Sequence, residues 1–299
     1  MFNKSLTLSN GVRIPQLALG TWLIDDDKAA AAVRAAAEIG YTHIDTAQAY
    51  ANERGVGEGI RTCGVARDKL FVTTKVAAEH KDYPSAAAGI DNSLRLMGLD
   101  YIDMMIIHSP QPWVEVNQSD NRYPEGNLEA WRALTDAYKA GKLRAIGVSN
   151  FLQEDIDNIW NHAEVKPMVN QVLCHISNTP LDLIDFCRRK GIVMEAYSPV
   201  AHGEALRIPA IAEMAKKYGV SVPQLCIRYD MQLGMVVLPK TANPAHMRTN
   251  ADVDFVISDA DMDILKHAEK IDNYGDSSFF PVFGGKLKGY SGRPGTEEI

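Results

Sequence analysis

Four residues whose side chains suit proton transfer follow one another along the first part of the chain. They are Asp45, Tyr50, Lys75 and His108, and each lies at or just beyond the end of a short apolar run. If these runs are neighbouring parallel strands of a barrel, the four side chains meet at its carboxyl end, where barrel enzymes carry out their chemistry. A carboxylate, a phenol, an ammonium group and an imidazole held together can form a proton donor with a shifted pKa.

Tyr50 is the expected proton donor of this set. Free tyrosine has a pKa near ~10, and lowering it to about 7 requires roughly 4 kcal/mol of preferential stabilisation of the phenolate. We expect the Lys75 cation to supply much of this in a partly desolvated site, and Asp45 to keep Lys75 charged. A neutral His108 would donate to a substrate oxygen and orient it. Each residue alone would more often be a cap, turn or packing residue, but the four in this order favour catalysis.

The elements that must position these residues alternate along the chain. Eight apolar runs typical of strands are separated by segments long enough for helices. The runs lie near 16–20, 43–46, 70–75, 102–108, 144–148, 168–172, 192–197 and 235–239. Eight alternations over about 225 residues match the roughly 250-residue size of a (β/α)8 barrel. We therefore predict an α/β fold, a (β/α)8 TIM barrel that forms a single domain over residues 1–299.

Two segments outside the alternation complete the expected fold. Asn10-Gly11 lies between two short strand-like runs and predicts an N-terminal β-hairpin with a type I′ turn. A glycine-rich C-terminal segment is expected to form a loop over the barrel. A long polar stretch over 109–127 follows the fourth strand, and loops of that length are usually functional or disordered.

Composition excludes several classes of protein. The net charge of -7 argues against nucleic acid as a bulk partner, and 23% charged residues is ordinary for a globular protein. The four cysteines include no Cys-x-x-Cys pair and form no disulfide framework, which favours a cytoplasmic location. No signal peptide and no membrane span is recognised. We expect no membrane or nucleic-acid partner and assign no metal site.

The run from Gly40 to Ala47, Gly-Tyr-Thr-His-Ile-Asp-Thr-Ala, resembles the signature of the aldo-keto reductases. Further resemblances occur at Tyr50-Ala51-Asn52-Glu53, Val56-Gly57, Thr74-Lys75, Ile107-His108, 147–151, Asn170-Gln171, 196–199 and 238–241. Together they span Gly20 to Asn250, most of the chain. The resemblance, to bacterial-type diketogulonate and aldehyde reductases, implies a (β/α)8 barrel that reduces aldehydes and ketones with a nicotinamide cofactor. The cofactor is usually NADPH and binds without a Rossmann domain.

The resemblance also implies a cofactor site. Tyr197 is expected to stack on the nicotinamide face, while Ser149, Asn150 and Gln171 hydrogen-bond its carboxamide. The pyrophosphate is expected along Ser198, Pro199, Val200 and Ala201, and Gly20, Thr21 and Asp45 are further expected cofactor contacts.

At the other end of the cofactor, Lys240 and Thr241 resemble the family's site for the adenosine 2′-phosphate. The start of the helix after Pro244 would add its dipole. His246 stands where many relatives carry arginine, Arg248 follows two residues later, and Asn250 is kept beside the adenine. We predict NADPH as the cofactor, with NADH left open as an alternative.

The substrate is expected to be a small carbonyl compound held against Tyr50 and His108. Trp22 stands where the family places an aromatic wall, and Trp113 is expected to help close the pocket, with ordinary packing as the alternative. Ser109 follows the histidine where relatives often carry tryptophan, so the pocket should be wider or more polar there. Aromatic residues of the C-terminal segment are further candidates for closing it, namely Phe279, Phe280, Phe283 and Tyr290.

Other classes of function remain as alternatives. The fold also occurs in non-catalytic nicotinamide-binding regulatory subunits, and barrels also host aldolases that form a Schiff base with lysine. The complete set of four residues argues against the first, and Asp45, which should keep Lys75 protonated, argues against the second. An NADH-preferring dehydrogenase is the third alternative. The residues name neither one carbonyl compound nor an oligomeric state.

Overall fold

The computed structural model describes residues 4–116 and 118–284. Within them, eight parallel strands form one sheet in which strands adjacent in sequence pair with each other. The strands are β3 (Leu19–Gly20), β4 (His43–Asp45), β5 (Phe71–Val76), β6 (Ile102–Ile107), β7 (Leu143–Ser149), β8 (Val169–Leu173), β9 (Val193–Tyr197) and β10 (Val236–Leu238). Hydrogen bonds from Ala18 N to Val237 O and from Gly20 N to Pro239 O, both 3.0 Å, join the first strand to the last. The predicted (β/α)8 barrel is confirmed.

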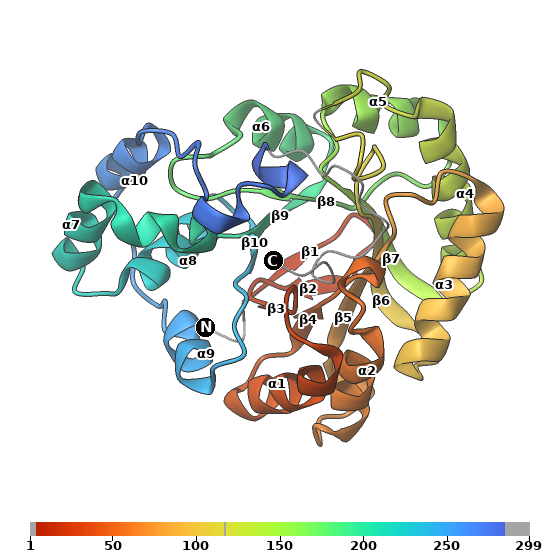
Figure 1. Ribbon diagram of the computed structural model, residues 1–299, viewed down its shortest axis with the longest axis horizontal. Helices are drawn as coiled ribbons and strands as arrows, with labels where there is room; N and C mark the ends of the chain where they lie inside the picture. The colour runs from red at the N-terminus through yellow and green to blue at the C-terminus, as the bar shows by residue number, and fades with distance from the viewer. Residues whose placement is uncertain (1–3, 117, 285–299) are drawn as a thin grey trace.

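Helices follow the strands and surround the barrel (Figure 1). They are α1 (Asp26–Ile39), α2 (Glu53–Thr62), α3 (Tyr83–Met97), α4 (Pro124–Lys139), α5 (Gln153–His162), α6 (Leu181–Arg189), α7 (Pro209–Lys217), α8 (Val222–Gln232), α9 (Pro244–Ala251) and α10 (Asp259–Lys266). Their ends follow from local chemistry. In α1, Asp26 and Asp27 occupy the positive N-terminal turn, and Gly40 ends the helix with a left-handed φ of 117°.

Glycines in α2 allow close helix packing, which explains the Gly-Val-Gly-Glu-Gly run over residues 55–59. A Cβ on Gly55 would lie 2.0 Å from Asp26 O in α1, and a Cβ on Gly57 would lie 2.3 Å from Met97 Cα in α3. Any larger side chain would therefore separate α2 from both neighbours.

The N-terminal hairpin is present, but its predicted turn type is wrong. Strands β1 (Ser5–Thr7) and β2 (Arg13–Pro15) pair antiparallel, with Leu6 opposite Ile14. Only Gly11 in the turn has a positive φ, 86°, whereas a type I′ turn needs two such residues. Gly11 N donates to Leu8 O at 2.9 Å and Leu8 N to Val12 O at 2.8 Å, which describes a type I turn followed by a left-handed glycine.

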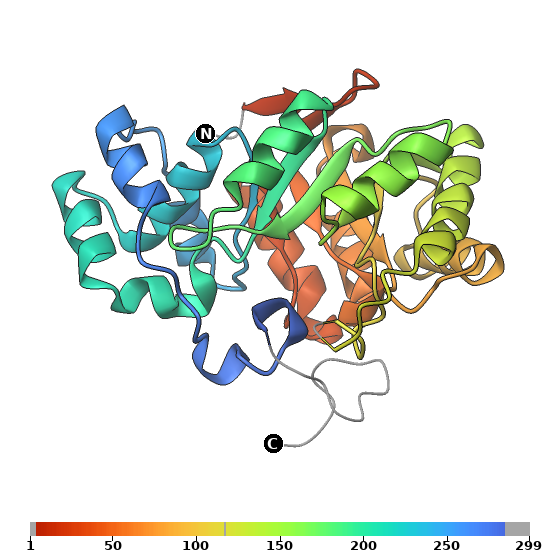
Figure 2. The same ribbon diagram turned by 90° about the horizontal axis from the view of Figure 1, so that it is seen from above.

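The two ends of the barrel are covered differently. Figure 2 shows the β1–β2 hairpin at one end and the C-terminal segment with η4 (Gly275–Ser277) and η5 (Pro281–Phe283) at the other. The second end is the one where Asp45 ends β4 and Ile107 ends β6. The expected long loop after β6 stops at Tyr123, because Pro124 supplies the fixed φ suited to the first turn of α4.

The barrel strands are buried almost throughout, as in other barrels with helices outside and packed side chains inside, and only Arg144 in β7 is exposed. All six residues of β5 and all six of β6 are buried. Among the described residues no helix combines the length and apolar character needed to cross a bilayer. All four cysteines are free thiols.

Candidate active site

Asp45, Lys75 and Tyr50 meet at the carboxyl end of the barrel. Lys75 Nζ donates to Asp45 Oδ1 at 2.5 Å, to Thr46 O at 2.8 Å and to Tyr50 Oη at 3.3 Å. His108 follows β6, and its ring centre lies 5.6 Å from that of Tyr50 in an edge-to-face arrangement. Strand register explains the meeting, because β4, β5 and β6 are adjacent and parallel.

The bonds of Lys75 determine where the hydroxyl proton of Tyr50 points. An ammonium group has three protons, and a carboxylate, a backbone carbonyl and the phenol oxygen accept all three. Since the phenol accepts from Lys75, its own proton is free for another acceptor. Tyr50 lines the cavity described below, so an oxygen bound there can receive this proton.

The expected lowering of the Tyr50 pKa is wrong for this structure. Burial raises the pKa of Tyr50 more than the Lys75 cation lowers it, and the Asp45 carboxylate raises it further. Burial also lowers the pKa of Lys75, but Asp45 and Tyr50 together outweigh burial and the net shift is upward. Burial and then the Lys75 charge hold the pKa of His108 well below its usual range, so its imidazole is neutral, as expected.

Two polar residues fix the turn that carries Tyr50. Gln48 Oε1 accepts from Ala77 N at 2.8 Å, and Gln48 Nε2 donates to Gly89 O at 2.9 Å, which ties η1 (Gln48–Tyr50) to the segment after β5 and to α3. Asn52 Nδ2 donates to Thr21 O at 2.9 Å. Sequence reasoning gave neither residue this role, because their partners are distant in the chain.

A cavity of about 560 Å³ opens beside Tyr50 and His108. Most of the residues predicted to bind cofactor or substrate line it. These are Gly20, Thr21, Trp22, Asp45, Tyr50, His108, Trp113, Ser149, Asn150, Gln171, Tyr197, Ser198, Pro199, Val200, Lys240, Thr241, His246 and Asn250. The cavity thus joins the four-residue cluster to the start of α9.

Three predicted site residues do not line the cavity, namely Lys75, Arg248 and Ala201, which is 0% exposed. Lys75 is fully buried beneath Tyr50, where it contacts the phenol from behind. Arg248, predicted at the cofactor site, is exposed, and its Nη1 lies 3.4 Å from Pro244 O. Positions two apart on a helix do not share a face, so His246 faces the cavity and Arg248 does not, and the predicted cofactor contact of Arg248 stays a prediction.

The C-terminal segment closes the cavity with some of its aromatic residues. Phe280 lines the cavity and its ring centre lies 4.8 Å from that of Trp22. Phe283 packs 4.7 Å from His202 behind the lining, while Phe279 is 52% exposed and does not line the cavity. Tyr290 lies outside the described residues.

Several lining residues were not assigned to the site from sequence. They are Leu23, Ala49, His202, Gly203, Leu206, Pro223, Leu238, Pro239, Thr249, Pro281 and Val282. By the resemblance, Thr249 stands near the adenine and His202 belongs to a loop over the pyrophosphate, and both line the cavity although neither was given a role. Leu206 has no signal in the sequence, because it belongs to the irregular segment η3 (Ala201–Arg207).

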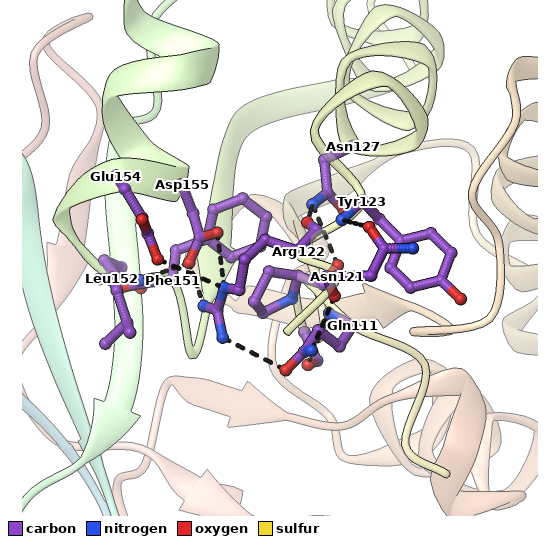
Figure 3. A network of polar contacts seen from close by, with 12 residues as sticks. Gln111, Asn121, Arg122, Tyr123, Asn127, Phe151, Leu152, Glu154 and Asp155 are labelled. Carbon is purple, nitrogen blue, oxygen red and sulfur yellow. Dashed lines mark hydrogen bonds and ion pairs between the residues drawn. The ribbon is translucent and has the colours of Figure 1, made fainter. Parts of the chain in front are cut away.

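A polar network holds the loop between β6 and α4 (Figure 3). Arg122 pairs with Asp155 of α5 through Nε at 3.0 Å and through Nη2, and its Nη1 donates to Gln111 Oε1 at 3.2 Å. Gln111 Nε2 in turn donates to Asn121 O at 2.7 Å. This loop carries Trp113, whose ring centre lies 4.9 Å from that of His108.

The groups along the cavity suit a phosphorylated dinucleotide. Beside Tyr50 and the Asp45 carboxylate lie the uncharged hydrogen-bonding side chains of Ser149, Asn150 and Gln171, which suit the amide of nicotinamide. At the other end Lys240 and Thr241 lie before the N-terminus of α9, where a cation and the positive end of the helix dipole attract a phosphate. Gly20 allows β3 to lie close to the segment that carries Lys240, because a Cβ there would lie 3.3 Å from Leu238 O.

Comparison with known proteins decides the family. The sequence pattern of the Aldo/keto reductase family matches residues 16–270. The chain belongs to the aldo/keto reductase family. Glyoxal reductase of Bacillus subtilis is 40% identical over 273 residues, which cover 91% of this chain and 95% of that protein.

Solved aldo/keto reductases share the fold. The aldo/keto reductase of Brucella melitensis superposes with a TM-score of 0.82 at 35% identity and covers 88% of this chain and 97% of its own. A Bombyx mori aldo-keto reductase in complex with NADP gives a TM-score of 0.80 at 30% identity, with 92% and 95% covered. As a family member, the chain is an oxidoreductase that acts on carbonyl and alcohol groups.

Proposed function

We propose that this aldo/keto reductase reduces aldehydes and ketones to alcohols with NADPH, and that Tyr50 is the general acid. The observation that carries the proposal is the set of three hydrogen bonds from Lys75, which leaves the Tyr50 proton directed away from Lys75. Bound NADPH would supply the hydride that reaches the carbonyl carbon. Ser149, Asn150, Gln171 and Tyr197 would hold its nicotinamide.

Tyr50 supplies the proton that the carbonyl oxygen needs as negative charge develops on it. Lys75 stabilises the phenolate that remains, because its ammonium already donates to the phenol oxygen. Asp45 keeps the buried ammonium charged through its 2.5 Å bond. His108, neutral at physiological pH, acts as a hydrogen-bond partner that orients the carbonyl.

The preference for NADPH is proposed from the far end of the cavity. Lys240, Thr241 and the N-terminus of α9 form a cationic end suited to a 2′-phosphate, and a relative of similar fold binds NADP. His246 lines the same end, while Arg248 is not among the residues that line it. We therefore expect NADPH to be preferred through Lys240.

A Schiff-base aldolase is not favoured. Lys75 is fully buried, all three of its protons are bonded, and its pKa is shifted upward, so the amine is neither free nor accessible. A nucleophilic lysine needs the opposite properties.

The proposal is tested with a panel of aldehydes and ketones, including short dicarbonyls, assayed separately with NADPH and NADH. We expect reduction with NADPH and slower reduction with NADH. Activity with neither cofactor on any carbonyl would overturn the proposed function. Faster turnover with NADH would overturn only the role given to Lys240 and Thr241.

A further inference from the structure

Glu195 is a buried carboxyl group that the mechanism above does not use. It lies on β9 and is 0% exposed. Its Oε2 accepts a hydrogen bond from Gln171 Nε2 at 2.8 Å, while Oε1 has no hydrogen-bond partner within residues 4–116 and 118–284. A buried carboxyl with an unbonded oxygen is unfavourable, so its position inside the barrel calls for a functional explanation.

Gln171 connects Glu195 to the four-residue cluster. The same Nε2 atom donates to Asp45 Oδ2 at 2.9 Å, and Asp45 Oδ1 accepts from Lys75 Nζ. Gln171 and Glu195 are direct neighbours in the paired strands β8 and β9, so their side chains lie on the same face of the sheet. A continuous series of hydrogen bonds therefore runs from Glu195 through Gln171, Asp45 and Lys75 to Tyr50.

These bonds also fix the orientation of the Gln171 amide. The Gln171 Nε2 group donates to both carboxyl groups, because turning the amide would place its oxygen against the Asp45 carboxylate. Only Oε1 is left, and Gln171 lines the cavity. Gln171 thus offers a bound molecule an acceptor only.

The charged groups that face Glu195 are Asp45 from β4 and Lys75 from β5. On the β10 side its paired neighbour is the apolar Val236. With both carboxyl groups ionised, two negative charges face one ammonium. Burial and then the Asp45 charge raise the pKa of Glu195 to about 8, so this carboxyl holds a proton at neutral pH and loses it in mildly alkaline solution.

We propose that Glu195 is a positioning residue that makes the choice between oxidised and reduced nicotinamide depend on pH. The inference rests on the proposed function, because it requires a nicotinamide cofactor beside Gln171. The oxidised ring carries a positive charge that the reduced ring lacks. Ionised Glu195 therefore favours the oxidised cofactor, and binding of the oxidised cofactor in turn favours ionised Glu195.

The experiment measures the dissociation constants of NADP⁺ and NADPH by fluorescence, without substrate, from pH 6.5 to 9.5. The ratio of the two constants removes contributions from the phosphates, which both cofactors share. In the unmodified chain we expect the dissociation constant of NADP⁺ divided by that of NADPH to fall about tenfold as the pH rises through about 8. A tenfold fall corresponds to a coupling of one pKa unit between Glu195 and the nicotinamide charge. The E195Q variant should show a flat ratio, and E195D should restore the fall with a different midpoint.

Asp230 provides a matched control. It is a second carboxyl that is 0% exposed with a raised pKa, and its Oδ1 lies 3.5 Å from Cys174 Sγ rather than near the cavity. The D230N variant should therefore follow the unmodified chain. The proposal would be overturned if the ratio of dissociation constants became independent of pH in D230N as well, or if it still fell with rising pH in E195Q.

The titration of the unmodified chain decides the matter even where E195Q does not fold, because a flat ratio there overturns the proposal by itself. Failure of the proposed function is separate. If the chain binds both cofactors but reduces no carbonyl, the proposed reductase activity is contradicted. If it reduces carbonyls but the ratio of the two dissociation constants does not change with pH, only the role of Glu195 is contradicted.

Discussion

At the residue scale, the cluster around Tyr50 works by distributing hydrogen bonds. Lys75 gives one proton each to a carboxylate, a carbonyl and the phenol, so the phenol keeps its own proton for a ligand. Because burial, together with the Asp45 charge, outweighs the Lys75 cation, the pKa of Tyr50 is not lowered before a substrate arrives. We infer that Lys75 matters most as the proton leaves, when a phenolate forms beside it.

The raised pKa of Tyr50 predicts opposite pH behaviour for the two directions of the reaction. Carbonyl reduction needs the protonated phenol, whereas alcohol oxidation needs the phenolate, which is scarce until pH approaches a pKa above the ordinary ~10. At saturating NADP⁺ and alcohol, kcat for oxidation should rise about tenfold per pH unit from pH 7 to 9. A plateau in kcat below pH 8 would show that Tyr50 is more acidic than this structure indicates.

Lys75 also predicts a large effect on stability. Replacing it in K75M leaves the buried Asp45 carboxylate without its cation, and such a loss costs about 3–5 kcal/mol of unfolding free energy. The matched control is K69M, since Lys69 is 72% exposed and pairs with the equally exposed Asp68. K69M should change the free energy of unfolding by less than about 0.5 kcal/mol. Urea unfolding compares them, and equal effects would contradict the account.

The four residues of the cluster could be predicted from sequence because each follows a strand-like run, and parallel strands bring their ends together. Glu195 and Gln48 could not, since nothing local distinguishes a glutamate inside a strand or a glutamine in a turn. Their roles arise from partners in distant segments, Gln171 for one and Ala77 and Gly89 for the other.

At the scale of elements, the strand ends position the side chains of the four-residue cluster, and the loops shape the cavity in which a substrate would bind. All eight strands were predicted from apolar runs, because buried parallel strands carry continuous apolar residues. The hairpin turn was predicted with the wrong type, since Asn10-Gly11 suits several turns and the length of the loop decides among them. The start of α4 was also missed, although Pro124 marks it.

The network around Arg122 predicts how one loop affects substrate binding. In R122A the buried Asp155 loses its partner and Gln111 loses a donor, so the loop that holds Trp113 against His108 should loosen. We expect KM for a carbonyl substrate to rise about tenfold, with kcat and NADPH affinity changed less than about threefold.

The control for this loop is R132A. Arg132 lies on the exposed side of α4 and pairs with Glu129 in the same helix, so its removal should leave steady-state kinetics unchanged. Unchanged KM in R122A, or an equal rise in R132A, would show that the network does not shape the pocket.

At the scale of the whole molecule, the candidate active site and the C-terminal segment that covers it lie at one end of the barrel, and the hairpin lies at the other. The position of the C-terminal segment could be predicted only in outline, because the sequence of a glycine-rich segment does not indicate which of its aromatic residues face inward. Phe280 faces the cavity and Phe279 does not. The hairpin contributes Ile14, which is 0% exposed, to the core.

We propose that residues 1–299 act as a single domain, since one hydrophobic core includes residues from Leu8 to Phe283. Thermal unfolding should then show one transition with equal calorimetric and van't Hoff enthalpies. Two resolved transitions would indicate separately folding parts.

The most direct test of the account is the Y50F variant, which keeps the ring and removes only the hydroxyl. Transient reduction of an aldehyde is followed by loss of NADPH absorbance, and NADPH affinity is measured by fluorescence on the same preparation. We predict that the rate falls by about a thousandfold or more while the dissociation constant of NADPH changes less than about twofold. A Y50F variant that reduces aldehydes at the rate of the unmodified chain would contradict the central claim that this hydroxyl delivers the proton.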